Sequence, residues 1–346
     1  MDDSTKVIPV TALAGPDRRG PNRRPAANRP PVPADIVVDS AAFQRLQKRI
    51  AAATILIPLV FSVAAVVLLF YVPITGLDLL LLLVMYVATT LGVTVGFHRQ
   101  FAHRSFKAKP ALRVALGVMG SMAGQGNLIY WVATHRRHHQ YSEGEGDPHS
   151  PYILDGKPLG KLRGLWHSHL GWMLDSQMTN TVKFTKDLMR EPSIAWVNRL
   201  YFQWVVLGLL IPAVLGGVLS LSWIGALTGF LWGGMVRLFL AQNAMWTSGS
   251  TAHIFGNRPF QTRDMSTNNG LLALPNLGEA WHNNHHAFPS SAFFGLDWWQ
   301  VDVGGYFIRL CEALGWASDV RIPSKDLIAA KKSGKIAEGA VEADQW

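Results

Sequence analysis

Three long apolar runs without a single charged residue limit what this chain of 346 residues can fold into. They are Ile50–Val72, Leu79–Phe97 and Tyr201–Val236. A helix needs about 20 residues to cross the apolar part of a bilayer, so the first two runs each predict one span. The third run is long enough for two spans, with Pro212 and the Gly216–Ser220 region as the expected break. The sequence therefore predicts an all-α integral membrane protein with four transmembrane helices.

The charges of the chain lie mainly outside these runs. Charged residues make up only 16% of the sequence, yet the formal net charge is +9. Basic residues are concentrated before the first run and directly after the second, while the turn Pro73–Gly76 between them has none. By the positive-inside rule both termini are expected in the cytoplasm, which for a bacterial host predicts an inner-membrane protein. A basic tail could also bind nucleic acid, but the spans behind it favour a topology signal.

The two ends of the chain differ in composition from the region between them. Residues 1–45 include the stretch PNRRPAANRPPVPA and predict a disordered basic tail, and residues 321–346 predict a flexible C-terminal tail. The membrane domain is expected over residues 46–320. The first apolar run is too long for the core of a signal peptide, so no cleaved leader is predicted. The single cysteine, Cys311, excludes disulfides within the chain, a zinc ribbon and an iron–sulfur cluster held by its own thiolates.

Nine of the twelve histidines fall in four motifs near the ends of the predicted spans. The motifs are HRQFAH (His98, His103), HRRHH (His135, His138, His139), GSTAH (His253) and HNNHH (His282, His285, His286). Residues i, i+3 and i+4 share one face of a helix, so HRRHH and HNNHH each direct three imidazoles the same way. The two histidines of HRQFAH are five residues apart and share a face only loosely. Nine imidazoles exceed the four ligands of a tetrahedral zinc and favour two metal ions.

The predicted topology places all four motifs on the cytoplasmic side of the membrane. This requires that neither Ala111–Trp131, rich in glycine and containing Gln125 and Asn127, nor the stretch from His139 to Tyr201 crosses the bilayer. Both are expected to form a helical cap against the bilayer surface or the protein. A redox-active metal pair there could attack a C–H bond of a lipid-like chain, which favours iron because zinc has no redox chemistry. A metal transporter or a bis-histidine haem carrier should instead have ligands near the bilayer midplane.

The residues around these histidines resemble the membrane-bound fatty acyl desaturases, in particular the stearoyl-CoA (Δ9) type. The matching segments are GFHRQFAHRSFKA, WVATHRRHHQYSEGEGDPH, GLWHSHLGW, NAMW…STAHIFGNRPF and GEAWHNNHHAFP, within roughly Leu91 to Trp316. The resemblance implies a two-iron enzyme that takes O2 and two electrons and makes a cis double bond, Δ9 by default, in a saturated long acyl chain. It implies no catalytic residue beyond the metal ligands, no site for an organic cofactor, and as ligands His98, His103, His135, His138, His139, His253, His282, His285 and His286. A hydroxylase or another lipid oxidase on the same scaffold remains an alternative.

The sequence departs from the family pattern at two places. The position four residues before His253, usually an asparagine that holds a metal-bound water, is Gly249, which leaves the surroundings of one iron open. The pairs that hold coenzyme A in the animal enzymes are replaced by Ala133-Thr134 and Ser176-Gln177. Fatty acyl-CoA is therefore the default carrier by resemblance, with a membrane lipid as the other candidate. Basic residues that could attract a phosphate, or simply face anionic lipid, are Lys157, Lys161, Arg163 and Arg190.

The chain has no flavin fingerprint, no C-x-x-C-H haem motif and no fused haem domain. Electrons are therefore expected from a separate ferredoxin-, rubredoxin- or b-type cytochrome-like partner that docks on the basic cytoplasmic face. Asp147 and Glu279 are candidates to orient ligand imidazoles, although loop polarity alone could explain them. Arg237 in the fourth span should face protein or the site, and Trp131 and Trp246 should line the acyl slot or anchor the interface. Structural or supporting roles are predicted for the remaining histidines, His149, His167 and His169.

Overall fold

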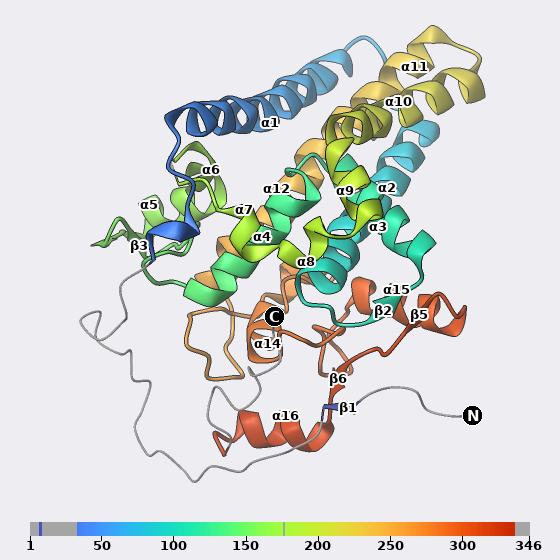
Figure 1. The fold of residues 1–346 in the computed structure, drawn as a ribbon. Coiled ribbons are helices and arrows are strands. Elements are labelled where there is room, and N and C mark those ends of the chain that lie inside the picture. The colour runs from blue at the N-terminus through green and yellow to red at the C-terminus, as the bar shows by residue number, and fades with distance from the viewer. Residues whose placement is uncertain (1–6, 9–32, 176, 336–346) are drawn as a thin grey trace.

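A computed structural model of the chain describes residues 7–8, 33–175 and 177–335. The described part is mostly helical (Figure 1), as the sequence predicts. Its strands are only two residues long and form three pairs. These pairs are β1 (Val7–Ile8) with β6 (Ile322–Pro323), β2 (Lys107–Ala108) with β5 (Ala317–Ser318), and β3 (Ile153–Leu154) with β4 (Lys157–Pro158).

Within the described residues, four helices are long and apolar enough to cross a membrane, which confirms the predicted number of spans. The first is α1 (Ala41–Leu68), and the second joins α2 (Gly76–Leu91) to the π-helix η3 (Gly92–Ala102). The third is α10 (Tyr201–Ser220). The fourth runs from Trp223 to His253 through α11 (Trp223–Gly229), the π-helix η5 (Phe230–Val236), α12 (Arg237–Gly249) and the 3-10 turn η6 (Thr251–His253).

The four spans differ in how much of their surface the protein covers. Only 17% of the most apolar window of α1 and of α10 is buried, against 56% in the second and fourth spans. The large exposed residues in the apolar parts of α1 and α10 are mainly leucine, isoleucine, valine and phenylalanine, as lipid contact requires. Helix α10 ends at Ser220, at the end of the predicted Gly216–Ser220 region, whereas Pro212 is inside α10 and the expectation of a break at this proline was wrong. Lost backbone bonds at a proline are tolerated in membrane helices because neighbouring groups satisfy them.

The glycine-rich segment after the second span forms two helices that are too short to cross the bilayer, as predicted. They are α3 (Pro110–Met122) and α4 (Leu128–Tyr141). Helix α3 packs tightly on η3. The approach is so close that a side-chain carbon on Gly92 would lie 2.1 Å from the backbone nitrogen of Gly120, so a glycine is required there. This close approach brings α3, and with it the start of α4, against the end of the second span.

The remaining helices form a cap at the end of the bundle where the second and fourth spans end (Figure 1). The cap contains α4 and the short elements α5 (Lys161–Trp166), η4 (His167–Gly171), α6 (Trp172–Leu174), α7 (Thr181–Phe184), α8 (Lys186–Met189), α9 (Pro192–Arg199), α13 (Gly270–Ala273), α14 (His282–Ala287), α15 (Val303–Ala313) and α16 (Lys325–Lys332). Helix α1 begins at Ala41, and α16 buries Leu327, so helical structure extends beyond the predicted domain boundaries at residues 46 and 320. Most of the predicted N-terminal tail, and residues 336–346, lie outside the described residues.

Buried arginines join these layers to one another. Arg237 of the fourth span donates hydrogen bonds to the carbonyl oxygens of Met122 (2.7 Å) and Gly208 (2.6 Å), so it faces protein, one of the two environments that the sequence predicts for it. Arg136 of α4 donates to Asp187 of α8 (2.7 Å) and to the carbonyl oxygen of Phe101 at the end of the second span (2.8 Å). Each guanidinium is nearly inaccessible and satisfies carbonyl groups that would otherwise be buried without partners.

Candidate metal centre

Two short helices place six of the histidines. His135, His138 and His139 lie on α4, and His282, His285 and His286 lie on α14, each set at the predicted i, i+3, i+4 spacing. Asn127 caps the start of α4 by accepting a hydrogen bond from the Tyr130 N–H group (2.9 Å). The spacing is as predicted, but the expectation that each helix directs its three imidazoles the same way was wrong, because the i+3 residues His138 and His285 lie in a different histidine cluster from the other two on their helix.

The π-helix η3 explains the wider spacing of HRQFAH. The His103 N–H group donates to the His98 carbonyl oxygen (3.1 Å), which is the i→i+5 bond of a π-helix. A turn of five residues puts these two histidines on the same face, and their ring centroids are 5.0 Å apart. The α-helical spacing rule predicts only a loose shared face here, because it does not anticipate the π-helix.

The nine predicted histidines gather into two groups. The five-histidine group contains His98, His103, His135, His139 and His285. The four-histidine group contains His138, His253, His282 and His286. Within each group the candidate ligand atoms all lie within 4.8 Å of one another. Helices α4 and α14 each contribute to both groups, so the two groups adjoin.

Imidazole nitrogens face one another in both groups at short range. In the five-histidine group, His285 Nε2 lies 3.0 Å from His98 Nε2 and 2.9 Å from His139 Nε2, and His103 Nε2 lies 2.8 Å from His135 Nε2. In the four-histidine group, His282 Nε2 lies 2.9 Å from His253 Nε2 and 3.0 Å from His286 Nε2.

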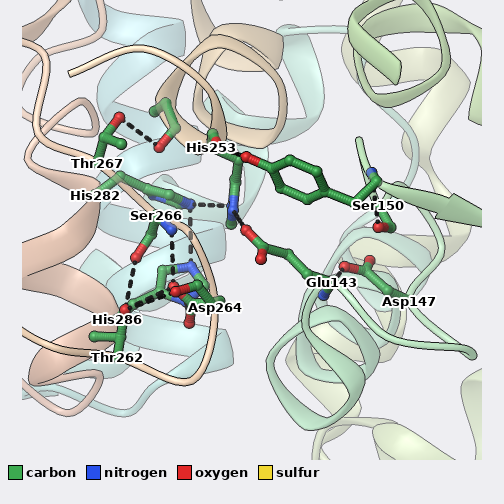
Figure 2. Close-up of polar contacts among 12 residues, drawn as sticks. Glu143, Asp147, Ser150, His253, Thr262, Asp264, Ser266, Thr267, His282 and His286 are labelled. Carbon is green, nitrogen blue, oxygen red and sulfur yellow. Dashed lines mark hydrogen bonds and ion pairs between the residues drawn. The ribbon is translucent and has the colours of Figure 1, made fainter. Parts of the chain in front are cut away.

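Carboxylates behind the rings show why this arrangement fits a cation. Glu143 accepts a hydrogen bond from His253 Nδ1 (2.8 Å) and Asp264 accepts one from His286 Nδ1 (2.7 Å), from different sides of the group (Figure 2). Because a carboxylate only accepts, both Nδ1 atoms have the proton and both Nε2 atoms present lone pairs. The Nε2 atom of His282 lies close to the Nε2 atoms of both His253 and His286, and it can donate a proton to at most one of them. At least one close pair of Nε2 atoms therefore has lone pairs directed at each other, an arrangement that a metal ion would stabilise.

The remaining ligand candidates have similar support. Asp147 accepts from His138 Nδ1 (3.0 Å), and the buried Nε2 atom of His138 has no hydrogen-bond partner. Glu279 accepts from His98 Nδ1 (2.5 Å) and is itself held by the Thr94 hydroxyl. The predicted orienting roles of Asp147 and Glu279 are therefore confirmed as hydrogen bonds.

The structure adds two orienting carboxylates that sequence reasoning missed. Glu143 lies in the SEGEGDPH segment directly after HRRHH, where its position was a usable signal. Asp264 lies in the loop between His253 and HNNHH, and no local pattern distinguishes it from other loop acids.

Burial favours the neutral, ligating form of most of these imidazoles. It lowers the pKa of His135, His139 and His282 well below 6.5, and neighbouring histidines lower the pKa of each further. Burial lowers the pKa of His286 to about 4, although Asp264 acts in the opposite direction. For His138, burial acts to lower the pKa, but Asp147, Asp264 and Glu143 together act in the opposite direction and the pKa is raised.

The three other histidines lie outside both groups. His167 pairs with Asp175 (3.1 Å). The Nδ1 atom of His169 lies 2.8 Å from the Ser250 hydroxyl, which ties η4 to the end of the fourth span. His149 stacks on His138, with ring centroids 4.3 Å apart.

A cavity of about 110 Å³ opens beside both groups. This volume is several times the ~15 Å³ that one water needs on the same measure. Its walls include Trp131 and Trp246, the two predicted lining residues, together with Met173 and Met245. His98, His135, His138 and His282 also line it, so an apolar chain placed there would lie against the candidate metal ligands. The Trp131 ring stacks on His135 at 5.1 Å.

The fold and these side chains define an integral membrane protein with two adjoining imidazole sites that fit metal ions. A family model described as fatty acid desaturase matches residues 75–302, and the chain belongs to that family.

Three curated relatives are similar over most of this chain. One is a hex-5-enoyl-[acyl-carrier protein] acetylenase of Moorena producens (strain JHB), 46% identical over 278 residues, which cover 80% of this chain and 87% of the relative. An acyl-CoA C20 Delta5-desaturase of Anemone leveillei is 37% identical, covering 68% and 70% respectively. The Delta-9 acyl-lipid desaturase 1 of Arabidopsis thaliana is 35% identical, covering 70% and 75%. The relatives thus differ in the carrier and in the bond position that their names state.

Proposed function

We propose that this chain is a diiron enzyme that removes two hydrogens from neighbouring carbons of an acyl chain. The single observation that carries this proposal is the pair of adjoining histidine groups on the wall of one apolar cavity. The nine histidines are the iron ligands, five on one ion and four on the other. Iron accepts imidazole ligands and, when bound, supplies the O2 chemistry that an unactivated C–H bond requires. In the balanced reaction, –CH2–CH2–, O2, two electrons and two protons give –CH=CH– and two waters.

The cavity residues position the chain for this reaction. Trp131 stacks on His135 on one wall, and Met245 and Trp246 form apolar wall elsewhere, so methylenes are held beside the ligands and water is displaced. Glu143, Asp147, Asp264 and Glu279 keep the Nδ1 protons of four imidazoles in place, which fixes the ring orientation and leaves each Nε2 for the metal.

The product is expected to be a cis double bond in a saturated long chain, with Δ9 as the starting hypothesis. The carrier is acyl-CoA or a membrane lipid, which agrees with the names of the Anemone and Arabidopsis relatives. A second candidate is triple-bond formation on an acyl chain held by acyl-carrier protein, which the 46% identity to the acetylenase favours. Electrons come from a separate ferredoxin-, rubredoxin- or b-type cytochrome-like donor.

We propose that the chain lies in a bacterial inner membrane, with the histidine end of the bundle on the cytoplasmic side. Arg45, Lys48 and Arg49 lie in the first turns of α1, and Arg104 and Lys107 follow the second span, so the basic residues and the histidine motifs share one end. The electron donor would approach from this side.

The test is expression in a host without its own desaturase, together with a ferredoxin system. Total fatty acids are profiled by mass spectrometry with assignment of unsaturation positions, and the intact protein is compared with His285→Ala. New monounsaturated chains made only by the intact protein support desaturation, and chains with a triple bond support the acetylenase alternative. Hydroxylated chains would contradict both of these activities and indicate a hydroxylase. Purified protein without iron would overturn the diiron proposal.

Replacing Asp264 with asparagine is expected to weaken iron binding at the four-histidine group by about 10- to 100-fold. Asp264 accepts from His286 Nδ1 (2.7 Å) through one oxygen and from the Ser266 N–H group (2.9 Å) through the other. An asparagine has a single acceptor oxygen, so its NH2 group must face one of these two donors. Iron retained by the purified protein against a competing chelator measures the effect.

Asp297→Asn is the matched control, because this carboxylate pairs with Lys332 at the surface (3.1 Å). It should keep both irons with unchanged affinity. If Asp264→Asn also binds both irons as tightly as the unmodified protein, the Asp264 carboxylate does not position His286 for a metal.

A further inference from the structure

The two histidine groups differ by one imidazole, and a tenth imidazole lies beside the smaller group. His149 stacks on His138 of the four-histidine group, with an interplanar angle of 24°. It lines the same cavity as His138 and His282. Its side chain is 12% exposed, and its buried Nδ1 atom makes no hydrogen bond and lies 4.0 Å from Asp147 Oδ1. An imidazole without a hydrogen bond can take a polar partner where its edge lines the cavity.

The glycine at position 249 leaves the space in which the His149 imidazole lies. A side-chain carbon built on Gly249 would project onto the His149 ring, 3.3 Å from both Cε1 and Nδ1. The His149 ring therefore takes the space that a larger residue at 249 would use. Gly249 is at the end of the fourth span, four residues before His253, so this space adjoins the four-histidine group.

The distances indicate how His149 could reach a metal. Its candidate ligand atom lies within 4.8 Å of those of His138 and Asp147, but His149 is not part of the compact set formed by His138, His253, His282 and His286. Direct coordination together with all four is therefore disfavoured, whereas a water molecule would bridge the extra distance. Asp147 fixes the segment on the other side, because its carboxylate accepts from His138 Nδ1 (3.0 Å) and from the His149 backbone N–H (3.1 Å).

We infer that His149 holds a water ligand of the metal in the four-histidine group, in place of a side chain at position 249. This inference rests on the proposed diiron function and names the residue that completes its second site. It gives the four-histidine group a fifth, exchangeable ligand on the side that faces the cavity.

The decisive variant is His149→Phe, which keeps a flat ring to stack on His138 and removes both nitrogens. Protein loaded with ⁵⁷Fe is studied by Mössbauer spectroscopy, and iron retention is measured against a chelator. We expect the signal of one iron to change, and that iron to bind at least about tenfold more weakly, while the other stays as in the unmodified protein. His167→Phe is the control, because His167 pairs with Asp175 outside both groups and should leave both signals unchanged.

A rescue variant separates this role from packing. In His149→Ala the space beside position 249 is open, so adding Gly249→Asn should supply a new polar side chain and restore the affinity to within about threefold. A merely structural loss of the ring would not be restored by an amide.

Each outcome decides the matter. Unchanged spectra and iron affinity in His149→Phe would overturn the inference and leave the diiron proposal intact, whereas unmodified protein without two irons would overturn the diiron proposal itself. If His149→Phe does not fold, His149→Ala with and without Gly249→Asn decides instead, because the space beside position 249 is then open. Weaker iron binding in His149→Ala that the added asparagine restores supports the inference, and an iron affinity unchanged by His149→Ala contradicts it.

Discussion

Replacing His285 with alanine is expected to lower product formation at least about 100-fold and to remove the iron of the five-histidine group. His285 is fully buried, and its Nε2 atom lies 3.0 Å from that of His98 and 2.9 Å from that of His139. It thus contacts both a histidine of the second span and one of α4. Removing it leaves a gap among buried nitrogens that no neighbouring side chain fills with a ligand atom.

Two measurements check this result: the iron content per chain of the purified protein, and the fatty acid products of cells that express it. His169→Ala provides the control, because His169 contacts Ser250 and Asn243 rather than either group. It should keep both irons. Full activity with two irons in His285→Ala would show that the ligand assignment is wrong at its central residue.

The sequence predicts the number of spans from the length of its apolar runs and the two histidine helices from the spacing of their histidines, and both are local features of the chain. It does not predict how the histidines divide between the metal sites. On α4, His135 and His139 join the five-histidine group and His138 joins the other, while on α14 His282 and His286 join the four-histidine group and His285 joins the first. Residues i and i+4 differ by about 40° around a helix axis, whereas i+3 and i+4 differ by about 100°. The i+3 residue therefore points to the neighbouring site once two such helices meet.

Features that depend on packing between distant segments also cannot be predicted from the sequence. The π-helical end of the second span arises where α3 packs at Gly92, and it changes which residues share a face. Asp264 reaches His286 only because the loop after His253 folds back over α14. Glu279 was identifiable because it lies three residues before HNNHH, although its actual partner is His98, far away in the sequence.

The salt bridge between Arg99 and Asp302 connects this metal-binding end to the rest of the cap. Arg99 follows His98 in η3 and is fully buried, and its guanidinium lies 3.9 Å from the Phe294 ring centroid. Asp302 is also buried, accepts from both terminal nitrogens of Arg99 (2.9 and 3.1 Å) and caps α15 by accepting from the Gly305 N–H group (2.9 Å). A single carboxylate thus holds the second span and the segment after HNNHH together.

Replacing Asp302 with alanine is therefore expected to destabilise the protein by roughly 3–5 kcal/mol, because a buried guanidinium loses the carboxylate that it hydrogen-bonds and keeps only the more distant Glu279, at 3.9 Å. Thermal unfolding in detergent measures the loss as a lower apparent Tm. Arg99→Met should cost less, because Asp302 would keep its hydrogen bonds from the backbone N–H groups of Phe294 (2.7 Å) and Gly305 (2.9 Å). Glu312→Ala breaks a partly exposed pair with Arg309 and should cost less than about 1 kcal/mol. Equal losses for Asp302→Ala and Glu312→Ala would mean that the buried pair does not join the cap to the membrane helices.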